Sequence, residues 1–541
     1  MKLGIGPIVG LAACGRPAEV PPEPVTCAEG AEVDVVTPTG AVLVRDVRVV
    51  VPRPAAAALE VDGEVVARWP AATVHDLPVF GRPGAVRDVR VLLTCDRLPG
   101  VVGPLAVDVG DGPDPWPTIE VLVDDPARRE PGLTLLDIGE PEGVQWVAVV
   151  EPDGVPVWAW ASSTGKVLDA RIEPDGTVWV LTDDEIAQID LLGRPLRRWR
   201  PTVGVVDDPV TPQDGTIPVD VNLFHHEVYP VPGGFLAMDQ ESTYVDAYPV
   251  STTLPNGPFA PAYVLNPVVV EVDLDGAVRS RFDLQSRLDP QRIGWLSLQE
   301  STPGYDWGHA NAIAVDPTDG GLVVSVRHQS AVVKLDRTTG DVVWILSNPA
   351  GWRSPWAELL LEPVGDVVWP GHQHAPMVTA AEDGTLEILM FDNGNFARTT
   401  PYDGDSDDTD DGQDYVSRMV AYRVDEAAGT VSEHWATFGT STGRLYSGAF
   451  GDADPQPLTG NRLGVWGMMF VDDGVRNVDR DRGQKSVRLV EAAPDRSVVW
   501  ELSAWGPLDA APQGWQTHRA QRVATLYPSA LEGSAVTPPA R

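Results

Sequence analysis

The chain has 541 residues, 43% of them hydrophobic, and a formal net charge of −38 at pH 7. That length is enough for a large core and for more than one domain. So negative a protein is repelled by duplex nucleic acid and by anionic membrane surfaces, which argues against a nucleic-acid partner. Its 52 Gly and 51 Pro are scattered along the sequence, which favours many short strands joined by turns.

The N-terminus is typical of an export signal with a lipid attachment site. Lys2 precedes an apolar run, Leu3–Ala13, that is too short to span a bilayer, and Leu-Ala-Ala-Cys at its end is similar to a bacterial lipobox. We expect residues 1–13 to be a lipoprotein signal peptide, Cys14 to be lipidated, and residues 14–26 to be a tether. The protein would then be exported and lipid-anchored, on the periplasmic or cell-surface side of the outer membrane. An ordinary signal peptide with an incidental cysteine is the alternative.

Residues 27–125 are expected to form a small N-terminal β-sandwich, because short β-branched segments alternate there with Pro, Gly and Asp. Cys27 and Cys95 flank this region, and an oxidising compartment favours a disulfide between them. Two separate buried thiols are the alternative. The strand-like segments are Val33–Val36, Ala41–Val50, Ala58–Val61 and Val89–Leu93.

Residues 130–530 contain a loose repeat in which a turn residue is followed, a few positions later, by a bulky aromatic residue. One turn, one short strand and one packing aromatic per unit indicate propeller blades, so the sequence predicts an all-β protein with a six-bladed β-propeller. Uneven spacing disfavours the alternative, a β-solenoid. The six copies are Gly154–Trp158, Gly193–Trp199, Gly276–Phe282, Gly340–Trp344, Gly429–Trp435 and Asp495–Trp500.

An acidic stretch, Asp403–Asp414, has seven Asp in twelve residues. Asp alternating with Gly and Ser can wrap a hard cation through oxygen ligands. One interpretation is a structural calcium at Asp403, Asp405 and Asp407, and the other is a solvated acidic loop. No other cofactor is expected.

The nine histidines fall partly into compact clusters, each at the start of a different predicted blade. Because the innermost strands of successive blades face one axis, side chains far apart in sequence can converge there. A side-chain period of two could also place His372 and His374 on one face, which keeps His372 as a helper or a metal ligand. The clusters are Phe224–Val228, with His225 and His226; Asp306–Asn311, with His309, followed by Arg327; and Gly371–Ala375, with His372 and His374.

Asp306–Asn311, with Ser325–His328 shortly after, resembles the central signature of the bacterial aryl-sulfate sulfotransferases. His-His-Glu, Gln-His-Ala and Phe-Asp-Asn-Gly-Asn occur in the family's order, and the resemblance covers residues 130–530. It implies a propeller with an N-terminal β-domain, an exported location and no nucleotide cofactor. It also implies a ping-pong transfer of a sulfuryl group from an aryl sulfate to a phenol through a sulfohistidine.

The resemblance also assigns roles to individual residues. His374 matches the nucleophile, and His225 or His226 matches a further site histidine. The family's hydroxyl donor has no secure match, and Gly308 stands where a bulkier residue is common. The residues that match the sulfate site are His309, Asn311 and Arg327; the candidates for the hydroxyl are Ser417, Thr440 and Ser447.

The chemistry of these residues fits such a transfer. A neutral imidazole is a competent nucleophile near pH 7, and the planar guanidinium of Arg327 suits two sulfuryl oxygens. Arg327 and Asn311 beside His309 fit an oxyanion better than a cation. Two alternatives stay open: a non-catalytic binding module of the same lineage, and a metal-dependent enzyme on the same scaffold. The sequence leaves open whether the protein forms a homo-oligomer.

Overall fold

The computed structural model describes residues 26–527 except 205–214, 252–253, 255–256, 295, 299, 302–303, 396–414, 473–474, 478–482 and 507–513. In these residues the regular secondary structure is β-strand, joined by turns and loops, apart from two short 3-10 helices, η1 (Arg327–Gln329) and η2 (Trp356–Leu359). In this part of the chain no helix combines the length and the apolarity needed to cross a bilayer. The all-β class predicted from the sequence is confirmed.

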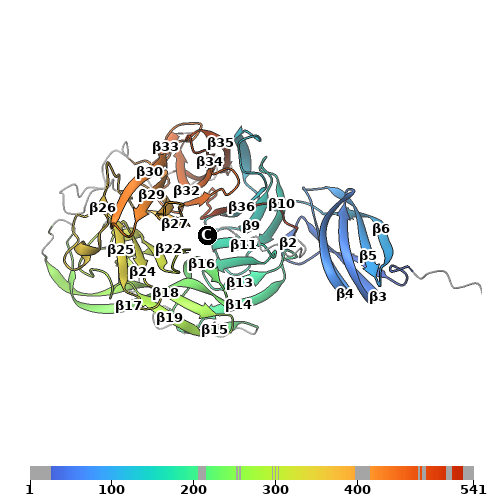
Figure 1. Ribbon diagram of the computed structural model, residues 1–541, viewed down its shortest axis with the longest axis horizontal. Helices are drawn as coiled ribbons and strands as arrows, with labels where there is room; N and C mark the ends of the chain where they lie inside the picture. The colour runs from blue at the N-terminus through green and yellow to red at the C-terminus, as the bar shows by residue number, and fades with distance from the viewer. Residues whose placement is uncertain are drawn as a thin grey trace, which may run out of the picture.

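The N-terminal region forms one antiparallel sheet of five strands, set to one side of the rest of the molecule (Figure 1). Its strands are β1 (Glu32–Val36), β3 (Val44–Val61), β4 (Glu64–Phe80), β5 (Val86–Cys95) and β6 (Leu98–Asp108). The first half of β3 pairs with β1 and β4, whereas its second half pairs with β4 and β5. Because β3 changes partners along its length, hydrogen bonds join all five strands into one continuous sheet.

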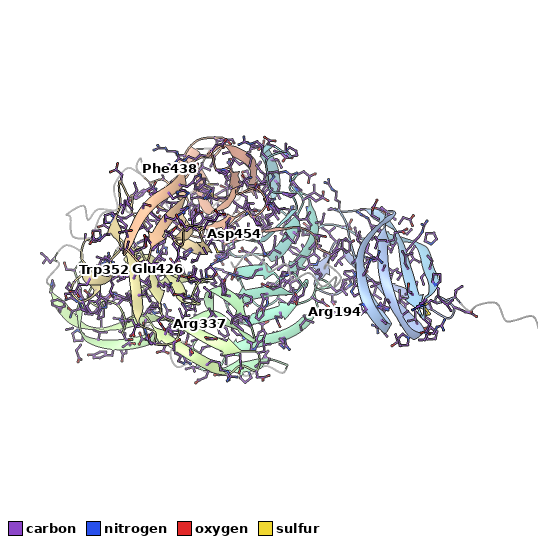
Figure 2. All side chains as sticks on the ribbon, viewed as in Figure 1. Arg194, Arg337, Trp352, Glu426, Phe438 and Asp454 are labelled. Carbon is purple, nitrogen blue, oxygen red and sulfur yellow. A yellow bond between two sulfur atoms is a disulfide. The ribbon has the colours of Figure 1, made fainter. Side chains whose placement is uncertain are left out.

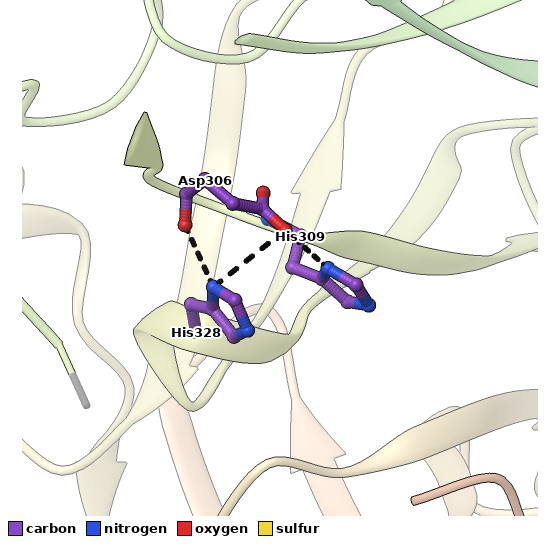
Figure 3. A group of neighbouring side chains, drawn as sticks. All are labelled: Asp306, His309 and His328. Atoms are coloured by element: carbon purple, nitrogen blue, oxygen red, sulfur yellow. Dashed lines mark hydrogen bonds and ion pairs between the residues drawn. The ribbon is translucent and has the colours of Figure 1, made fainter. Parts of the chain in front are cut away.

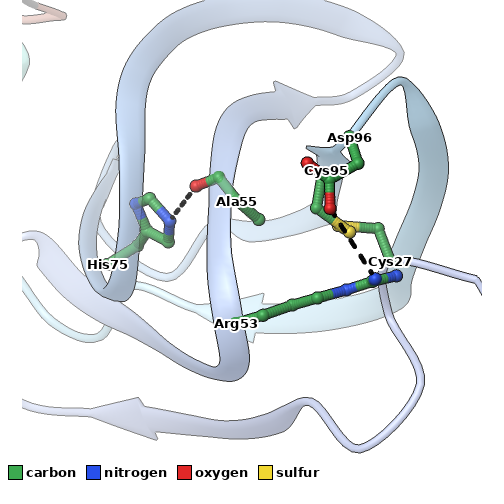
Figure 4. Close-up of a disulfide and its surroundings, with 6 residues drawn as sticks. All are labelled: Cys27, Arg53, Ala55, His75, Cys95 and Asp96. Carbon is green, nitrogen blue, oxygen red and sulfur yellow. Dashed lines mark hydrogen bonds and ion pairs between the residues drawn. A yellow bond between two sulfur atoms is a disulfide. The ribbon is translucent and has the colours of Figure 1, made fainter.

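A disulfide between Cys27 and Cys95 ties the segment before β1 to the end of β5 (Figure 4). Their Cα atoms are 5.6 Å apart, although 68 positions separate them in sequence. Both cysteines belong to the apolar core of the sheet, with Val47, Val49 and other inward-facing residues. The bond thus closes the end of the sheet around its core.

Six further sheets follow, each with a meander of four antiparallel strands, and they surround a common centre (Figure 1). Sheet 1 contains β36 (Ala520–Val523), β8 (Leu133–Gly139), β9 (Gln145–Val150) and β10 (Pro156–Ala161). Sheet 2 contains β11 (Val167–Ile172), β12 (Val178–Thr182), β13 (Ile186–Ile189) and β14 (Pro195–Pro201). Sheet 3 contains β16 (His225–Val231), β17 (Gly234–Pro249), β18 (Phe259–Asp273) and β19 (Val278–Asp283).

The other three sheets continue the ring in chain order. Sheet 4 contains β22 (Ala310–Val315), β23 (Leu322–Val326), β24 (Ala331–Leu335) and β25 (Val342–Ser347). Sheet 5 contains β27 (His374–Ala380), β28 (Leu386–Asp392), β29 (Arg418–Asp425) and β30 (Thr430–Thr437). Sheet 6 contains β31 (Asp452–Pro455), β32 (Arg462–Asp472), β34 (Gln484–Ala492) and β35 (Val498–Trp505).

Short strands extend several of these sheets. Two of them come from the N-terminal region: β2 pairs with β10 of sheet 1, and β7 pairs with β35 of sheet 6. Because β7 lies before residue 125 but belongs to sheet 6, the two predicted domains share strands rather than meeting at a clean boundary. The short strands are β2 (Ala41–Val42), β7 (Thr118–Asp124), β15 (Ile217–Val219), β20 (Glu300–Ser301), β21 (Gly304–Asp306), β26 (Glu362–Pro363) and β33 (Val475–Asn477).

The strands nearest the centre contact one another in sequence order. Strand β11 contacts β8 and β16, β16 contacts β22, β22 contacts β27, and β27 contacts β31. The C-terminal strand β36 pairs with β8 and also contacts β32, which joins sheet 6 to sheet 1. In Figure 1 the labels β11, β16, β22, β27 and β36 lie around the middle of the ring. Residues at the starts of these strands therefore lie near one another in space.

The repeated aromatic residue lies on the fourth strand of every sheet, where it connects neighbouring sheets. In five sheets it is a tryptophan whose Nε1–H donates to the turn between the third and fourth strands of the next sheet; in sheet 3 it is Phe282. The bond from Trp500 runs from sheet 6 to sheet 1 and closes the ring. The acceptors are the carbonyl of Leu191 for Trp158, of Leu274 for Trp199, of Pro494 for Trp435 and of Pro152 for Trp500, and the carboxylate of Glu426 for Trp344.

Charged side chains join the N-terminal sheet to the ring. Arg194, between the two parts in Figure 2, donates to Asp76 of β4 at 2.8 Å and to Asp190 at 2.7 Å. Arg82 likewise reaches Glu151 and Asp153 in the β9–β10 turn. These contacts add to the β2–β10 pairing in holding the sheet against sheets 1 and 2.

Candidate active site

A β-bulge marks the start of three inner strands, beside the histidines singled out from the sequence. His226 and His309 have φ of 59° and 46°, left-handed conformations that are uncommon for residues other than glycine and that cluster at functional sites. A bulge redirects side chains out of the regular alternation of a strand. The register shifts lie between His225 and Val228 in sheet 3, between Ala310 and Ala312 in sheet 4, and between His374 and Met377 in sheet 5.

His225 and His226 are hydrogen-bonded to each other, with 2.6 Å between their Nδ1 atoms. Nε2 of His225 lies 3.3 Å from the carbonyl oxygen of Asp239, so this nitrogen carries the proton and donates. Nδ1 of His225 then accepts from Nδ1 of His226, which leaves a lone pair on Nε2 of His226. The ring of His226 lies 4.8 Å from that of His309. Of the pair, His226 is thus the one that joins the other histidines.

His309 is oriented by Asp306, whose Oδ2 accepts from Nδ1 of His309 at 2.5 Å (Figure 3). His328 stacks on His309 with the ring centroids 4.6 Å apart, and its Nδ1 lies 2.7 Å from the carbonyl of Asp306. The His309 side chain is 29% exposed, whereas that of His328 is buried. Asp306 therefore positions both imidazoles, with Nε2 of His309 directed away from the carboxylate.

His374 is buried at the start of β27, and its Nδ1 lies 2.6 Å from Oδ1 of Asn393. The orientation of the Asn393 amide is set by its Nδ2, which donates to the carbonyls of Ser447 and Phe450, both at 2.8 Å. Since Oδ1 can only accept, Nδ1 of His374 must carry the proton. The free lone pair of neutral His374 is then on Nε2, the nitrogen available for attack.

Arg327 and Asn311 lie beside the nucleophile candidate. Nδ2 of Asn311 donates to the carbonyl of Gln373, the residue before His374, at 3.0 Å. Arg327 donates to the carbonyl of Gly448 at 3.3 Å. Burial and then the charge of Arg327 hold the pKa of His374 well below its usual range. The structure thus brings together His309, Asn311, Arg327 and His374, from sheets 4 and 5.

Burial dominates the titration of the other histidines as well. It lowers the pKa of His225 to about 4 and holds that of His226 well below its usual range. The charges of His309, His225, His374 and His518 depress the pKa of His226 further. At neutral pH His226 and His374 are therefore uncharged, as a nucleophile and its neighbours require.

The remaining candidates from the sequence have other partners. The side chain of His372 has different partners from that of His374: its Nδ1 lies 3.2 Å from Nδ2 of Asn395, and its ring lies 5.6 Å from that of His328. The three candidate hydroxyls, of Ser417, Thr440 and Ser447, each donate to a backbone carbonyl, of Asn393, Gly443 and Ala449 respectively. They stabilise the loops behind the site.

Gly308 accommodates a close approach of sheet 3. A Cβ at this position would meet Cγ of Pro267 at 2.9 Å. A bulkier residue would therefore not fit here without movement of the neighbouring strand.

Sequence reasoning missed His518 and Asp137, which lie 2.8 Å apart at the junction of sheets 6 and 1. It also missed a buried ion network beneath the histidines, in which Glu227 binds Arg171 and Arg519. His518 could have been noticed as one of only nine histidines in the chain. Its partner is 381 positions away, and no local pattern connects the two.

Some side chains could offer ligand atoms to a metal. Asp306, His309 and His328 present ligand atoms within 4.8 Å of one another. However, Nδ1 of each imidazole already has an oxygen of Asp306 as its partner, so hydrogen bonds account for their positions. The proposed calcium ligands Asp403, Asp405 and Asp407, and the lipidation site Cys14, lie outside the described residues.

A family model for arylsulfotransferases (ASST) matches residues 120–501. The chain belongs to the arylsulfotransferase family. The family assignment inferred from the sequence is confirmed, and the matched region extends from β7 to β35, so it contains all the histidines described above except His518.

Named relatives agree with this family. The chain is 27% identical over 293 residues to "Arylsulfate sulfotransferase AssT" of Escherichia coli O6:H1 (strain CFT073), covering 50% of this chain and 47% of the relative. It is 25% identical over 296 residues to the protein of the same name from Lelliottia amnigena, with the same coverage of each chain. The chain thus spans about half the length of the curated relatives it matches. A solved structure of a Bacteroides caccae protein of unknown function has 11% identity and a TM-score of 0.35, covering 72% of this chain and 98% of its own.

Proposed function

We propose that this arylsulfotransferase-family protein moves a sulfuryl group from an aryl sulfate to a phenol through His374. The observation that carries the proposal is the state of His374: it is buried, its Nδ1 proton is held by Asn393, and Nε2 is left as a neutral nucleophile beside Arg327. The related proteins named arylsulfate sulfotransferases support the same chemistry.

The reaction would proceed in two halves. In the first, the Nε2 lone pair of His374 attacks sulfur, the bond from sulfur to the aryl oxygen breaks, and the oxygen keeps the bonding pair. The aryl oxygen leaves as a phenolate, which takes a proton from water, and the sulfuryl group stays on Nε2. In the second half, the oxygen of an acceptor phenol gives its proton to water and attacks sulfur, and the nitrogen–sulfur bond breaks, which returns the electron pair to His374. Splitting one transfer into two in this way is the usual benefit of covalent catalysis.

Arg327, His309 and Asn311 would stabilise the transferring group. Charge on a sulfuryl group in flight resides on its equatorial oxygens, as in phosphoryl transfer. A guanidinium and preorganised N–H donors meet such oxygens at little reorganisation cost, and losing one donor typically lowers the rate by about 10²–10³-fold. Glu227 and Asp169 already neutralise Arg171 and Arg519, so we assign the sulfuryl contact to Arg327.

We further propose that the six sheets are the blades of a six-bladed propeller, spanning residues 130–530, with residues 27–125 as an accessory β-domain. The ring of inner-strand contacts and the bond that closes it from Trp500 support this arrangement. Export as a lipid-anchored protein through Cys14 stays a prediction from the sequence.

A transfer assay tests the function. The full chain would be incubated with 4-nitrophenyl sulfate, with and without phenol, and both 4-nitrophenolate and phenyl sulfate would be measured. We expect release that depends on phenol, and a sulfuryl adduct on the peptide containing His374 when the acceptor is omitted. His374→Ala should abolish both, whereas His434→Ala, at an exposed position of β30, should change neither.

Other outcomes would overturn the proposal. A folded protein that transfers nothing from any aryl sulfate would be a binding module. Activity that disappears with a chelator and returns with a metal would identify a metal-dependent enzyme instead.

A further inference from the structure

Glu227 lies where the inner strand of sheet 3 leaves its regular register. The register shift between His225 and Val228 makes His226 and Glu227 the two residues of a bulge. A bulge turns side chains out of the regular alternation of a strand. His226 thereby joins the other histidines, and the side chain of Glu227 is buried one residue further along β16.

The carboxylate of Glu227 binds the inner strand of sheet 4. That strand has its own bulge, and the register shift between Ala310 and Ala312 makes Asn311 the extra residue in it. Oε2 of Glu227 accepts from the backbone N–H of Ile313 at 2.5 Å. Ile313 is two positions after Asn311, so this bond fixes β22 immediately behind the bulge.

Two guanidinium groups hold the carboxylate of Glu227 in this direction. Nη2 of Arg171 donates to Oε1 at 2.5 Å, and Nη2 of Arg519 lies 2.9 Å from Oε2. Asp169 is the second carboxylate of the network and lies 3.1 Å from Arg171 and 3.4 Å from Arg519. None of these four side chains is more than 11% exposed. Two positive and two negative charges so buried fix each other's positions, because leaving one of them unpaired is costly.

A further hydrogen bond continues the connection from sheet 4 to the nucleophile candidate. Nδ2 of Asn311 donates to the carbonyl of Gln373 at 3.0 Å, and His374 is the next residue. This bond and the bond from Ile313 to the carboxylate therefore join β16, β22 and the start of β27 in order (Figure 1). A displacement of β22 at Ile313 would shift Asn311 relative to His374.

Similar bonds join other inner strands of the ring. Oε1 of Gln521 accepts from the N–H of Ile172 at 2.9 Å, and Oδ2 of Asp452 accepts from the N–H of Ala520 at 3.2 Å. These strands hold none of the residues assigned to the sulfuryl group. Glu227 differs because the strand that it binds carries Asn311.

We propose that Glu227 is a positioning residue for sulfuryl transfer: its carboxylate holds β22, and with it Asn311, where the amide meets the sulfuryl group on His374. The inference rests on the proposed function. Glu227 makes no proposed contact with substrate and acts through the backbone of Ile313. Its loss should therefore slow the transfer step and leave the binding of the aryl sulfate nearly unchanged.

Glu227→Gln tests this role, because the amide keeps the shape of the side chain but has one acceptor oxygen for three N–H partners. With 4-nitrophenyl sulfate as donor, the first-turnover rate at saturating donor should fall by about 10²-fold, the usual cost of misplacing a reacting group by about 1 Å. The donor concentration that gives half of this rate should stay nearly unchanged. A rise in that concentration with the rate intact would overturn the proposal.

Glu491 offers a matched control in sheet 6, near the end of β34. Its buried carboxylate also binds a guanidinium and a backbone N–H, those of Arg522 at 2.6 Å and Glu130 at 2.5 Å. Glu491→Gln should lower the melting temperature about as much as Glu227→Gln and leave the first-turnover rate unchanged. An equal loss of rate in both variants would indicate general destabilisation and would overturn the positioning role.

A double-mutant cycle tests whether Glu227 acts through Asn311. Asn311→Ala removes the amide, so adding Glu227→Gln to that variant should slow the first turnover by less than about 10-fold, because the two residues belong to one network. If Glu227→Gln costs as much without the Asn311 amide as with it, the proposed role is wrong.

Asp169→Asn is the second variant, for use if Glu227→Gln does not fold. It keeps the carboxylate of Glu227 and weakens the support of Arg171 and Arg519, so the first-turnover rate should fall by a smaller factor. A rate equal to that of the wild type would overturn the proposal.

The outcomes separate this role from the proposed function. If the wild-type protein transfers sulfuryl groups and Glu227→Gln does so at the same rate, the positioning role is wrong and the proposed function stands. If the wild-type protein transfers from no aryl sulfate, the proposed function is wrong, and the role of Glu227 falls with it.

Discussion

His374 and Asn393 are locked together across the first hairpin of sheet 5, with 2.6 Å between Nδ1 of the imidazole and Oδ1 of the amide. His374 begins β27 and Asn393 follows the end of β28, so the two ends of one hairpin meet at the site. Asn393 is held in turn by the carbonyls of Ser447 and Phe450, which precede sheet 6. The tautomer of the proposed nucleophile therefore depends on the contact between two sheets.

Asn393→Leu should lower kcat for sulfuryl transfer by about 10²-fold and leave KM for the aryl sulfate nearly unchanged, because misplacing a reacting group costs about that much. The residue orients His374 and makes no proposed contact with substrate. The buried carbonyls left without a donor should also lower the free energy of unfolding by about 1–3 kcal/mol. Steady-state kinetics well below the melting temperature would measure the effect, and a raised KM with kcat intact would contradict it.

The pH dependence of the first half-reaction should reflect the lowered pKa of His374. Burial and Arg327 disfavour the imidazolium, so His374 should stay a nucleophile below about pH 6.5, the ordinary histidine value. With 4-nitrophenyl sulfate as donor, the rate of 4-nitrophenolate release in the first turnover should stay at its value at neutral pH as the pH is lowered past about 6.5. Arg327→Met removes one of the causes that lower the pKa of His374, and should therefore move the acid limb of the pH–rate profile to higher pH. A wild-type midpoint at or above pH 6.5 would refute this account.

Asp452, on the inner strand of sheet 6, should make stability fall as pH rises. Burial and then the charge of Asp454 raise its pKa from 3.8 to about 8. The folded protein keeps this proton up to about pH 8, whereas the unfolded chain releases it near pH 4. The stabilisation of the fold by protonated Asp452 is therefore complete below about pH 4 and is lost as the pH rises to about 8.

Asp452→Asn mimics the protonated form and should lose less stability than the wild type between pH 5 and pH 8, measured by thermal or urea unfolding. Asp383→Asn is the control, because hydrogen bonds with Thr385 lower the pKa of that exposed carboxyl and it does not titrate in this range. A parallel pH dependence of Asp452→Asn and wild type would show that Asp452 is already ionised in the fold.

Trp500→Phe should lower the free energy of unfolding by about 1 kcal/mol, the usual net value of one intramolecular hydrogen bond, with a further loss from the smaller ring. Its Nε1–H donates to the carbonyl of Pro152 at 2.8 Å and joins the last sheet to the first. Trp435→Phe removes the equivalent bond between sheets 5 and 6 and should cost about as much. If Trp500→Phe left the free energy of unfolding unchanged, other contacts would be the ones that close the ring.

Much of the architecture could be predicted from local patterns in the sequence. Alternating β-branched residues indicated the strands, and the recurring aromatic marked the fourth strand of all six sheets, from Trp158 to Trp500. The clusters around His226, His309 and His374 indicated both the family and the strands that meet at the centre. These features are local because strand periodicity, turn chemistry and short motifs are each contained within a few residues.

Contacts between distant segments decided the rest. The sequence could not distinguish His225 from His226, since a bulge and a hydrogen bond to Asp239 determine which ring turns inward. It could not show that Ser417 and Ser447 donate to backbone carbonyls, or that β7 joins sheet 6. Above all, it could not pair His518 with Asp137, because the closing of the ring brings together two segments from its opposite ends. Tautomers, side-chain directions and long-range partners depend on packing in three dimensions, and the local sequence does not contain that information.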